Sequence, residues 1–254
     1  MVHFVGAGPG AFDLITVRGA RLLSEADLII YAGSLVNPEL LKYAKAGCEI
    51  HDSAYLTLEE VLSLMKKAEK AGQNTVRLHT GDTSLYSAMR EQIDELIKEG
   101  IPYDIVSGVS SFSAAAAALE AEYTLPEVTQ TVIISRMAGR TPVPEKESMK
   151  NLSKIGSTMV IFLSSSLIPQ LVSELLEGGA YSRVTPAAIV YKASWPEERV
   201  FRCTLDTLEK TAKENGIRKT ALIIVGNFMD SLYERSKLYD PSFTTEFRKA
   251  SHES

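Results

Sequence analysis

Residues 79–86 read HTGDTSLY and stand between two segments of different pattern. The residues before them, 75–78, are rich in β-branched and apolar side chains, as a short strand is. The residues after Thr83 carry apolar side chains at helix spacing, which predicts a helix over 84–98. The octapeptide is therefore predicted to be a strand-to-helix turn with one glycine, one carboxylate and three Ser/Thr hydroxyls. An open α/β sheet usually presents its ligand site at such turns, beyond the carboxyl ends of its strands.

Asp82 is the carboxylate of this turn, and its residue type alone leaves three roles open. It could act as a catalytic base, hold a ribose hydroxyl of a ligand, or cap the N-terminus of the following helix. The neighbouring Thr80 and Gly81 favour a ligand-binding loop. His79 adjoins the same turn, and we interpret it as structural rather than catalytic.

Composition places the chain among ordinary globular proteins. Its 254 residues suit one large or two small domains, and 45% of them are hydrophobic and 23% charged. The formal net charge of -5 disfavours non-specific binding to nucleic acid. No apolar run approaches the roughly 20 residues of a membrane span, and the N-terminal segment lacks the pattern of a signal peptide. We therefore expect a cytoplasmic protein with neither a membrane nor a nucleic acid as partner.

Cysteine and histidine give no sign of a metal site. Cys48 and Cys203 are far apart and cannot supply the closely spaced ligands of structural zinc. We interpret both as small buried apolar residues in a reducing compartment. The four histidines show no metal-ligand spacing either: His3, His51, His79 and His252.

Strand-like and helix-like segments alternate along the chain, which predicts an α/β fold with mostly parallel strands. In the first half, strands are predicted at 3–6, 28–31, 49–51, 75–78 and 103–106, and helices at 17–25, 38–44, 58–71, 84–98 and 113–121. In the second half, strands are predicted at 130–134, 158–163, 186–191, 199–203 and 221–225, and helices at 167–177 and 205–214. The pattern changes between 120 and 128. We therefore predict an N-terminal α/β domain over 1–122, a C-terminal α/β domain over 123–230 and a polar tail over 231–254.

The first glycine-rich turn reads GAGPGA at residues 6–11 and fits a dinucleotide-binding pattern. Three features argue against that role. Pro9 removes an amide that a phosphate could use, residues 13–16 delay the helix, and the second strand ends without an acid for a ribose hydroxyl. We interpret the segment as a tight backbone turn that lines a cleft.

A second turn reads SGVSSF at residues 107–112 and suggests a nucleophile elbow. That motif requires glycine two residues on either side of the serine, and Phe112 occupies the second position. No well-placed His–acid pair accompanies Ser110, so the sequence does not support a serine hydrolase. Hydroxyls and amides at a helix start can instead hold a polar ligand.

A basic, irregular segment contains Arg136 and Arg140 and is interrupted by two prolines. With Lys192, Arg218 and Lys219 it could bind carboxylates, which a guanidinium matches bidentately. Scattered solvated charges explain the same residues equally well.

Taken in order, these motifs resemble those of the tetrapyrrole methyltransferases of the corrin and sirohaem pathways. The shared runs are VGAGPG at 5–10 with DLIT at 13–16, HTGD at 79–82 and GVSS at 108–111. Within that family the chain is most similar to the subgroup that methylates carbon 11 of cobalt-precorrin-4 or precorrin-4. The subgroup signals are GRTPVPE at 139–145 and YKASWP at 191–196. Family members usually carry proline at the positions of Thr83 and Ser107, so both adjoining turns are expected to be looser here.

The resemblance implies two α/β domains with an S-adenosylmethionine cleft between them, a homodimer, and an open trough for the tetrapyrrole beside the 6–10 turn. It implies an in-line transfer of the sulfonium methyl to a ring carbon, with no general base that we can name. The implied cofactor contacts are Pro9, Thr80, Gly81, Asp82, Leu85, Ser110 and Ser111 from the first domain and Leu163, Ala188, Tyr191, Thr220 and Ala221 from the second. Arg136, Arg140 and Lys192 are the candidates to neutralise the acetate and propionate arms of the substrate. Asp82 thereby becomes a cofactor contact rather than a catalyst.

Two other functions stay open on the sequence. One is a methyltransferase of the same fold that acts at another ring position or on a different substrate, such as the diphthamide residue of a protein. The other is a non-catalytic protein that binds or carries a tetrapyrrole. The sequence also leaves open whether the natural substrate contains cobalt.

Overall fold

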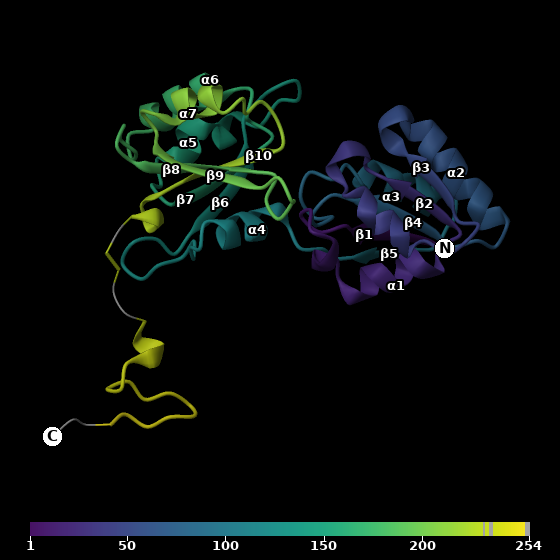
Figure 1. The fold of residues 1–254 in the computed structure, drawn as a ribbon, viewed down its shortest axis with the longest axis horizontal. Helices are drawn as coiled ribbons and strands as arrows, with labels where there is room; N and C mark the ends of the chain where they lie inside the picture. Colours follow the sequence, from purple (N-terminus) through teal and green to yellow (C-terminus); the bar gives the residue numbers. More distant parts are fainter. Residues whose placement is uncertain (231, 234–235, 252–254) are drawn as a thin grey trace. The chain divides into compact units, whose positions relative to one another are not determined.

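A computed structural model of the protein describes residues 1–230, 232–233 and 236–251. It divides into two compact units (Figure 1). The first unit comprises Met1–Ala118 and Lys192–Arg199, and the second comprises Leu119–Tyr191 and Val200–Ser254. The predicted boundary at 122/123 thus lies four residues beyond the division after Ala118, and the sequence analysis did not separate 192–199 from the second domain. Of the predicted tail, 231, 234–235 and 252–254 lie outside the described residues, and so does His252.

The first unit contains a five-stranded sheet in the order β3-β2-β4-β1-β5. Its strands are β1 (Val2–Gly6), β2 (Leu28–Tyr31), β3 (Glu49–Asp52), β4 (Thr75–His79) and β5 (Tyr103–Val106). Every neighbouring pair is parallel. All carboxyl ends therefore lie at one edge, and β1 stands between β4 and β5. This order brings the turns after these three strands together.

Helices cover both faces of this sheet. They are α1 (Val17–Glu25), α2 (Leu58–Lys70) and α3 (Arg90–Lys98), with short 3-10 helices at Phe12–Leu14, Gly33–Leu35, Pro38–Tyr43 and Ser53–Tyr55. A further helix, α4 (Ser111–Ala118), follows the turn after β5. The core cluster on one face contains side chains of α1, and the cluster on the other contains side chains of α2 and α3. The predicted N-caps are present: Thr16 accepts from the Gly19 amide at 3.1 Å, and Thr57 forms a capping box with Glu60.

The helix predicted over 84–98 begins only at Arg90. Tyr86 and Ala88 have φ angles of 54° and 51°, in the left-handed region that an α-helix does not use. The prediction was wrong for 84–89. Apolar residues in this segment have the spacing of a helix, but its backbone forms a turn. Likewise, α4 covers 111–118 rather than 113–121, and the helix predicted at 38–44 is of the 3-10 type.

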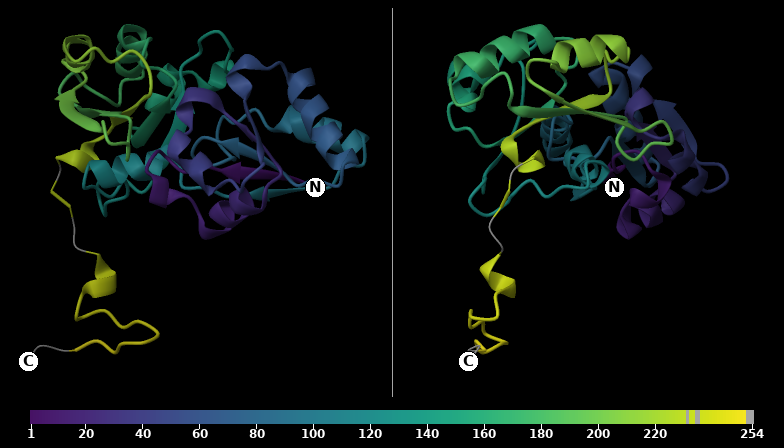
Figure 2. Two further views of the ribbon diagram at one scale, coloured as in Figure 1. Left: turned by 45° about the vertical axis from the view of Figure 1, so that its right-hand side comes forward. Right: turned by 60° about the vertical axis from the view of Figure 1, so that its left-hand side comes forward.

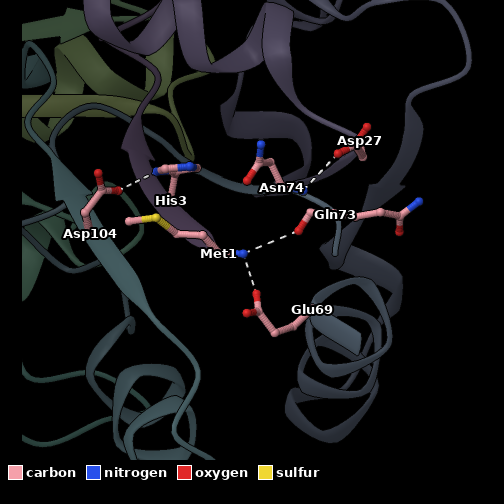
Figure 3. A network of polar contacts seen from close by, with 7 residues as sticks. All are labelled: Met1, His3, Asp27, Glu69, Gln73, Asn74 and Asp104. Atoms are coloured by element: carbon pink, nitrogen blue, oxygen red, sulfur yellow. Dashed lines mark hydrogen bonds and ion pairs between the residues drawn. The ribbon is translucent and has the colours of Figure 1, made fainter. Parts of the chain in front are cut away.

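A polar network joins the amino ends of strands in the first sheet (Figure 3). This edge is opposite to the one at which the turns after β1, β4 and β5 lie. His3 Nδ1 lies 2.7 Å from Asp104 Oδ1, which joins β1 to β5. The backbone nitrogen of Met1 donates to the Gln73 carbonyl at 3.4 Å and contacts Glu69. This edge is cross-linked by side chains, so His3 has a structural role.

The second unit contains a five-stranded sheet in the order β6-β7-β10-β8-β9. Its strands are β6 (Val132–Arg136), β7 (Thr158–Phe162), β8 (Pro186–Tyr191), β9 (Arg199–Thr204) and β10 (Ala221–Val225). β6 and β7 pair in parallel, whereas β10 runs antiparallel to both β7 and β8. The prediction of mostly parallel strands is correct for the first sheet and wrong for the second, because a buried apolar run does not encode strand direction.

Three helices lie together on one face of the second sheet: α5 (Met149–Ser153), α6 (Ile168–Glu177) and α7 (Leu208–Glu214) (Figures 1 and 2). Their apolar side chains build one core cluster with the strands. Short 3-10 helices occur at Glu145–Glu147, Asn227–Met229 and Lys237–Tyr239. The sequence analysis missed α5, and β6 and α7 begin later than predicted.

Cys48 and Cys203 were predicted to be buried, but both are only half-buried, Cys48 against the core of the first unit and Cys203 against that of the second. Within the described part of the chain, no helix is long and apolar enough to cross a membrane.

Candidate functional site

Three turns of the first unit meet backbone to backbone at the carboxyl edge of the sheet. The Gly8 amide donates to the Gly81 carbonyl at 3.1 Å, and the Gly81 amide donates back to Gly8 at 2.9 Å. A Cβ on Gly6 would lie 2.6 Å from the Gly108 Cα, and one on Gly108 would lie 2.2 Å from the Gly81 oxygen. Both distances are below any real Cβ contact, so only glycine allows this approach.

Three amides of the 6–11 turn donate to acceptors within the protein. Ala7 donates to the His79 carbonyl at 2.7 Å, Gly8 donates to Gly81, and Ala11 donates to Ser194 Oγ at 2.9 Å. Pro9 has no amide hydrogen. These donors are not directed at a phosphate, which agrees with the rejection of a dinucleotide site and with the interpretation as a close-approach turn.

Asp82 links the turn after β4 to the turn after β5. Its Oδ2 accepts from the Gly108 amide at 2.7 Å, and its Oδ1 accepts from the Ser84 amide at 2.9 Å and from the Ser84 hydroxyl. Burial alone would raise the pKa of Asp82, but the hydrogen bonds from Ser84 and Gly108 outweigh burial and lower it below the ordinary value. The helix-cap role is wrong, because α3 begins eight residues later, at Arg90.

The predicted first-domain contacts surround this junction. Gly81 has a φ of 64°, and a Cβ there would meet Ser111 N at 3.6 Å and Ser110 Cα at 3.7 Å. Ser110 is buried, and Ser111 begins α4. The structure therefore brings together Pro9, Thr80, Gly81, Asp82, Ser110 and Ser111. Leu85 lies farther along the same turn, its amide 3.5 Å from the Asp82 carbonyl.

The hydroxyl group of Thr80 is buried and lacks a hydrogen-bond partner among the described residues. An unpaired buried hydroxyl costs free energy that a polar group of a bound ligand would recover. Thr80 thus fits a ligand with hydroxyl or amino groups, as S-adenosylmethionine has.

His79 lies at the end of β4 with 2% of its surface exposed. Its ring stacks on Phe4, with centroids 6.0 Å apart. Burial, and secondarily the charge of Arg77, lowers the pKa of His79 to about 3, so the imidazole is neutral at physiological pH. This environment supports the structural interpretation of His79.

Four of the five predicted second-unit contacts share one edge of the second sheet. Tyr191 ends β8 and pairs with Ala221, which begins β10 directly after Thr220. Leu163 directly follows β7. Because Ile161 of β7 pairs with Ile223 of the antiparallel strand β10, Leu163 lies near the start of β10, and 64% of the Leu163 surface is exposed. Ala188 is different: it lies within β8, fully buried opposite Ile224. Its cofactor contact stays a prediction, as do the others.

The predicted substrate-binding cations belong to both units. Arg136 ends β6 and donates to three carbonyl oxygens of its own loop, those of Met137, Thr141 and Pro142. Arg140 lies exposed in that loop. Lys192 belongs to the first unit, where its Nζ lies 3.4 Å from Glu197 Oε1.

The two positions where family members usually carry proline differ in environment. Thr83 is 3% exposed, and its carbonyl accepts from the Ser87 hydroxyl at 2.5 Å. Ser107 is exposed. The turn at Thr83 is thus held by a hydrogen bond of its own, despite the missing proline.

Sequence reasoning missed the residues that hold the 9–11 segment: Asn37, Ser194 and Trp195. The run YKASWP at 191–196, with the only tryptophan of the chain, was the available signal for two of them. Their contact with a turn about 185 positions away was not available from local pattern.

The fold and the three glycine turns define a class, and comparison with known proteins identifies it. The sequence model of the family described as Tetrapyrrole (Corrin/Porphyrin) Methylases matches residues 1–209. The chain belongs to this family, which confirms the resemblance inferred from its motifs.

Particular relatives narrow the comparison. The chain is 54% identical over 250 residues to the Cobalt-precorrin-4 C(11)-methyltransferase of Methanocaldococcus jannaschii, covering 98% of this chain and 96% of the relative. The X-ray structure of a cobalamin biosynthetic enzyme, cobalt precorrin-4 methyltransferase, has a TM-score of 0.88 at 45% identity, covering 91% of this chain and 96% of that one. Uroporphyrin-III C-methyl transferase from Thermus thermophilus, complexed with S-adenyl homocysteine, has a TM-score of 0.75 at 26% identity, covering 89% of this chain and 97% of that one.

Proposed function

We propose that this protein transfers a methyl group from S-adenosylmethionine to carbon 11 of cobalt-precorrin-4 or precorrin-4 during assembly of the corrin ring. The observation that carries the proposal is the similarity, over nearly the whole chain, to a relative named for that reaction. The three glycine turns at the carboxyl edge of the first sheet supply the site that such an activity requires.

In the first unit, the cofactor would be held by the junction of the three turns. Thr80 offers its unpartnered hydroxyl, and the backbone at Gly81 is open to close approach because it bears no side chain. Asp82 acts through the backbone, because Gly108 and Ser84 occupy its carboxylate. Leu163, Tyr191, Thr220 and Ala221 are the proposed contacts of the second unit, and Ala188 supports them from within β8. When bound, the cofactor supplies an electrophilic methyl group on a sulfonium.

Catalysis by these residues is mainly positioning. Holding two reactants in line can contribute about 7–11 kcal/mol to the lowering of a barrier. His79 is buried and neutral, and the carboxylate of Asp82 is occupied by hydrogen bonds, so neither is offered as a general base. His79 and Asp82 instead stabilise the turns of the site. These turns are proposed to aid the methyl transfer by holding the reactants in position.

Arg140 and Lys192 are proposed to neutralise carboxylate arms of the tetrapyrrole. Arg136 supports the same task indirectly, because its guanidinium holds the carbonyls of the loop that carries Arg140. An exposed guanidinium on a braced loop suits bidentate binding of a carboxylate.

The activity is tested by incubating the protein with S-adenosylmethionine and either cobalt-precorrin-4 or precorrin-4. We expect product heavier by one methylene unit in at least one arm, and the faster arm identifies the cobalt status of the substrate. If neither arm gives methylated product while another tetrapyrrole does, the alternative of a same-fold methyltransferase with a different target replaces the proposal.

The non-catalytic alternative is a tetrapyrrole carrier. Calorimetry with S-adenosylmethionine separates it from the enzyme, because only the enzyme has use for this cofactor. Saturable binding at one site per chain supports the enzyme. Absence of binding by a folded sample that still binds the tetrapyrrole supports the carrier.

The protein is further proposed to be a cytoplasmic homodimer, as the family resemblance implies. Sedimentation equilibrium across a range of concentrations tests this assembly. A mass of twice 27.8 kDa supports the dimer, and a mass of 27.8 kDa throughout contradicts it.

A further inference from the structure

The segment Lys192–Arg199 follows β8 in sequence but folds as part of the first unit. It carries the only tryptophan of the chain, Trp195. The loop is braced internally: the Trp195 amide donates to the Lys192 carbonyl at 2.9 Å, and the Glu198 amide donates to the Trp195 carbonyl at 3.0 Å. Glu198 Oε2 also accepts from the Ser194 amide at 2.6 Å. The loop is therefore a built structure rather than an open connection.

Two residues of this loop have left-handed backbone although neither is glycine. Lys192 has a φ of 49° and Ser194 a φ of 67°. A left-handed backbone at a non-glycine residue is strained, and it persists where surrounding contacts determine the conformation. Ala193 between them is buried, with 6% of its surface exposed. Besides its internal hydrogen bonds, the loop is held by its contacts with the 9–11 segment.

Three side chains hold three successive residues of that segment. Trp195 Nε1 donates to the Pro9 carbonyl at 2.9 Å, and Ser194 Oγ accepts from the Ala11 amide at 2.9 Å. Between them, Asn37 Nδ2 donates to the Gly10 carbonyl at 2.7 Å. Pro9 has no amide hydrogen, so its carbonyl is the only polar backbone group by which its position can be fixed.

The indole ring also explains the glycine at position 10. A Cβ on Gly10 would lie 2.1 Å from Trp195 Cδ1 and 2.2 Å from Nε1. The Lys192 ammonium lies over the same ring, 5.3 Å from its centroid, within the range of a cation–π interaction. The ring therefore lies close to both the Lys192 ammonium and the backbone of Gly10.

We propose that Trp195 is a positioning residue, which fixes the Pro9–Gly10 turn in the shape that receives the cofactor. This inference rests on the proposed function and on the contact between Pro9 and S-adenosylmethionine that the family resemblance implies. Trp195 itself touches neither reactant in this account. It acts through the Pro9 carbonyl and through the exclusion of any side chain at Gly10.

The first test is Trp195→Phe, which keeps an aromatic ring and removes the indole N–H. We expect the Kd for S-adenosylmethionine, measured by calorimetry well below the melting temperature, to rise about 3- to 10-fold, the effect of one lost hydrogen bond. Tyr55→Phe, at an aromatic residue 86% exposed in the same unit, is the matched control and should bind as the wild type does.

The possible results separate the two proposals. A wild type that binds saturably, with an unchanged Kd in Trp195→Phe, overturns the positioning role and leaves the proposed function intact. A wild type that shows no binding defeats the proposed function and the positioning role together. A purely structural role would lower the melting temperature of Trp195→Phe without changing the Kd of the folded protein, and this result also counts against the proposal.

The second test is a double-mutant cycle between Gly10→Ala and Trp195→Ala. If the ring is what requires glycine, Gly10→Ala should weaken cofactor binding at least about tenfold in the wild type but less than about twofold in the Trp195→Ala background. Effects that simply multiply would overturn the claim that the ring imposes glycine at this position.

Discussion

The carboxylate of Asp82 accepts the backbone amide of Gly108 at 2.7 Å and thereby joins the turns after β4 and β5. The same carboxylate accepts two donors from Ser84. From its residue type alone, Asp82 could have been a base, a ligand of a ribose hydroxyl or a helix cap. The structure shows instead that it cross-links two turns of the candidate site. We propose that Asp82 influences a ligand only through the backbone that its carboxylate holds.

Asp82→Asn should weaken cofactor binding about tenfold. An asparagine must direct an NH2 group at one of the donors, Gly108 or Ser84, and such a mismatch costs about 1–3 kcal/mol. Calorimetry and steady-state kinetics measure the result, with Asp94→Asn, in an exposed pair with Arg90, as control. A variant that keeps normal cofactor affinity but loses turnover would contradict this role and restore Asp82 as a catalytic candidate.

Gly108→Ala should lower the free energy of unfolding by about 3 kcal/mol, because the new Cβ meets backbone atoms that cannot move aside. Gly139→Ala is the matched control for stability, since a Cβ there meets only the Leu167 side chain at 3.7 Å. Urea denaturation measures both variants. Equal stabilities would mean that the three turns are less closely packed than described.

His79 should make stability depend on pH. Its pKa is lowered to about 3, first by burial and then by Arg77, so the unfolded chain binds this proton more readily than the folded one. Its contribution is fully present above about pH 6.5 and is lost, at up to about 1.4 kcal/mol per pH unit, as pH falls towards 3.

Denaturation series across that range test this dependence. We expect His79→Gln to flatten the decline between pH 6.5 and 3 relative to the wild type, whatever its effect on absolute stability. An unchanged slope in His79→Gln would show that this imidazole titrates normally.

The two arginines of the 136–145 loop should behave differently. Arg140→Ala is expected to raise KM for the tetrapyrrole about tenfold, the effect of one charge-assisted contact, and to leave cofactor affinity unchanged. Arg136→Ala should raise the same KM and also make the loop more susceptible to proteolysis, because three carbonyl contacts are lost. If Arg140→Ala leaves KM unchanged, its charge is merely solvated.

The sequence allowed prediction of the features that depend on local pattern. The strand-to-turn positions of Gly6–Gly10, Thr80–Asp82 and Ser107–Ser111 follow from apolar runs that end in glycine and hydroxyl residues, and Thr16 and Thr57 are caps recognisable by type. The direction of β10 was not predictable, because an apolar strand reads the same in either direction. The left-handed backbone at Tyr86 and Ala88 was also missed. Apolar residues keep helical spacing through this segment, although its backbone is not helical.

Long-range contacts account for what the sequence did not reveal about the site. The Asp82–Gly108 bond and the Trp195–Pro9 bond join residues from distant parts of the chain. Motif comparison placed Asp82, Gly108 and Pro9 in turns near a site, but it did not connect Trp195 with the Pro9 turn, and neither hydrogen bond follows from local pattern. Ala188 is the opposite case: a position carried over from the family lies buried within β8, and its role is still to be tested.

The most direct measurement is the fate of a methyl group labelled with carbon-13 in S-adenosylmethionine, followed by NMR of the tetrapyrrole after incubation with the protein. The account predicts one enriched methyl signal per product, with couplings that assign it to carbon 11 of the ring. A labelled methyl at any other ring carbon, or an unlabelled tetrapyrrole from a sample that binds both reactants, would contradict it.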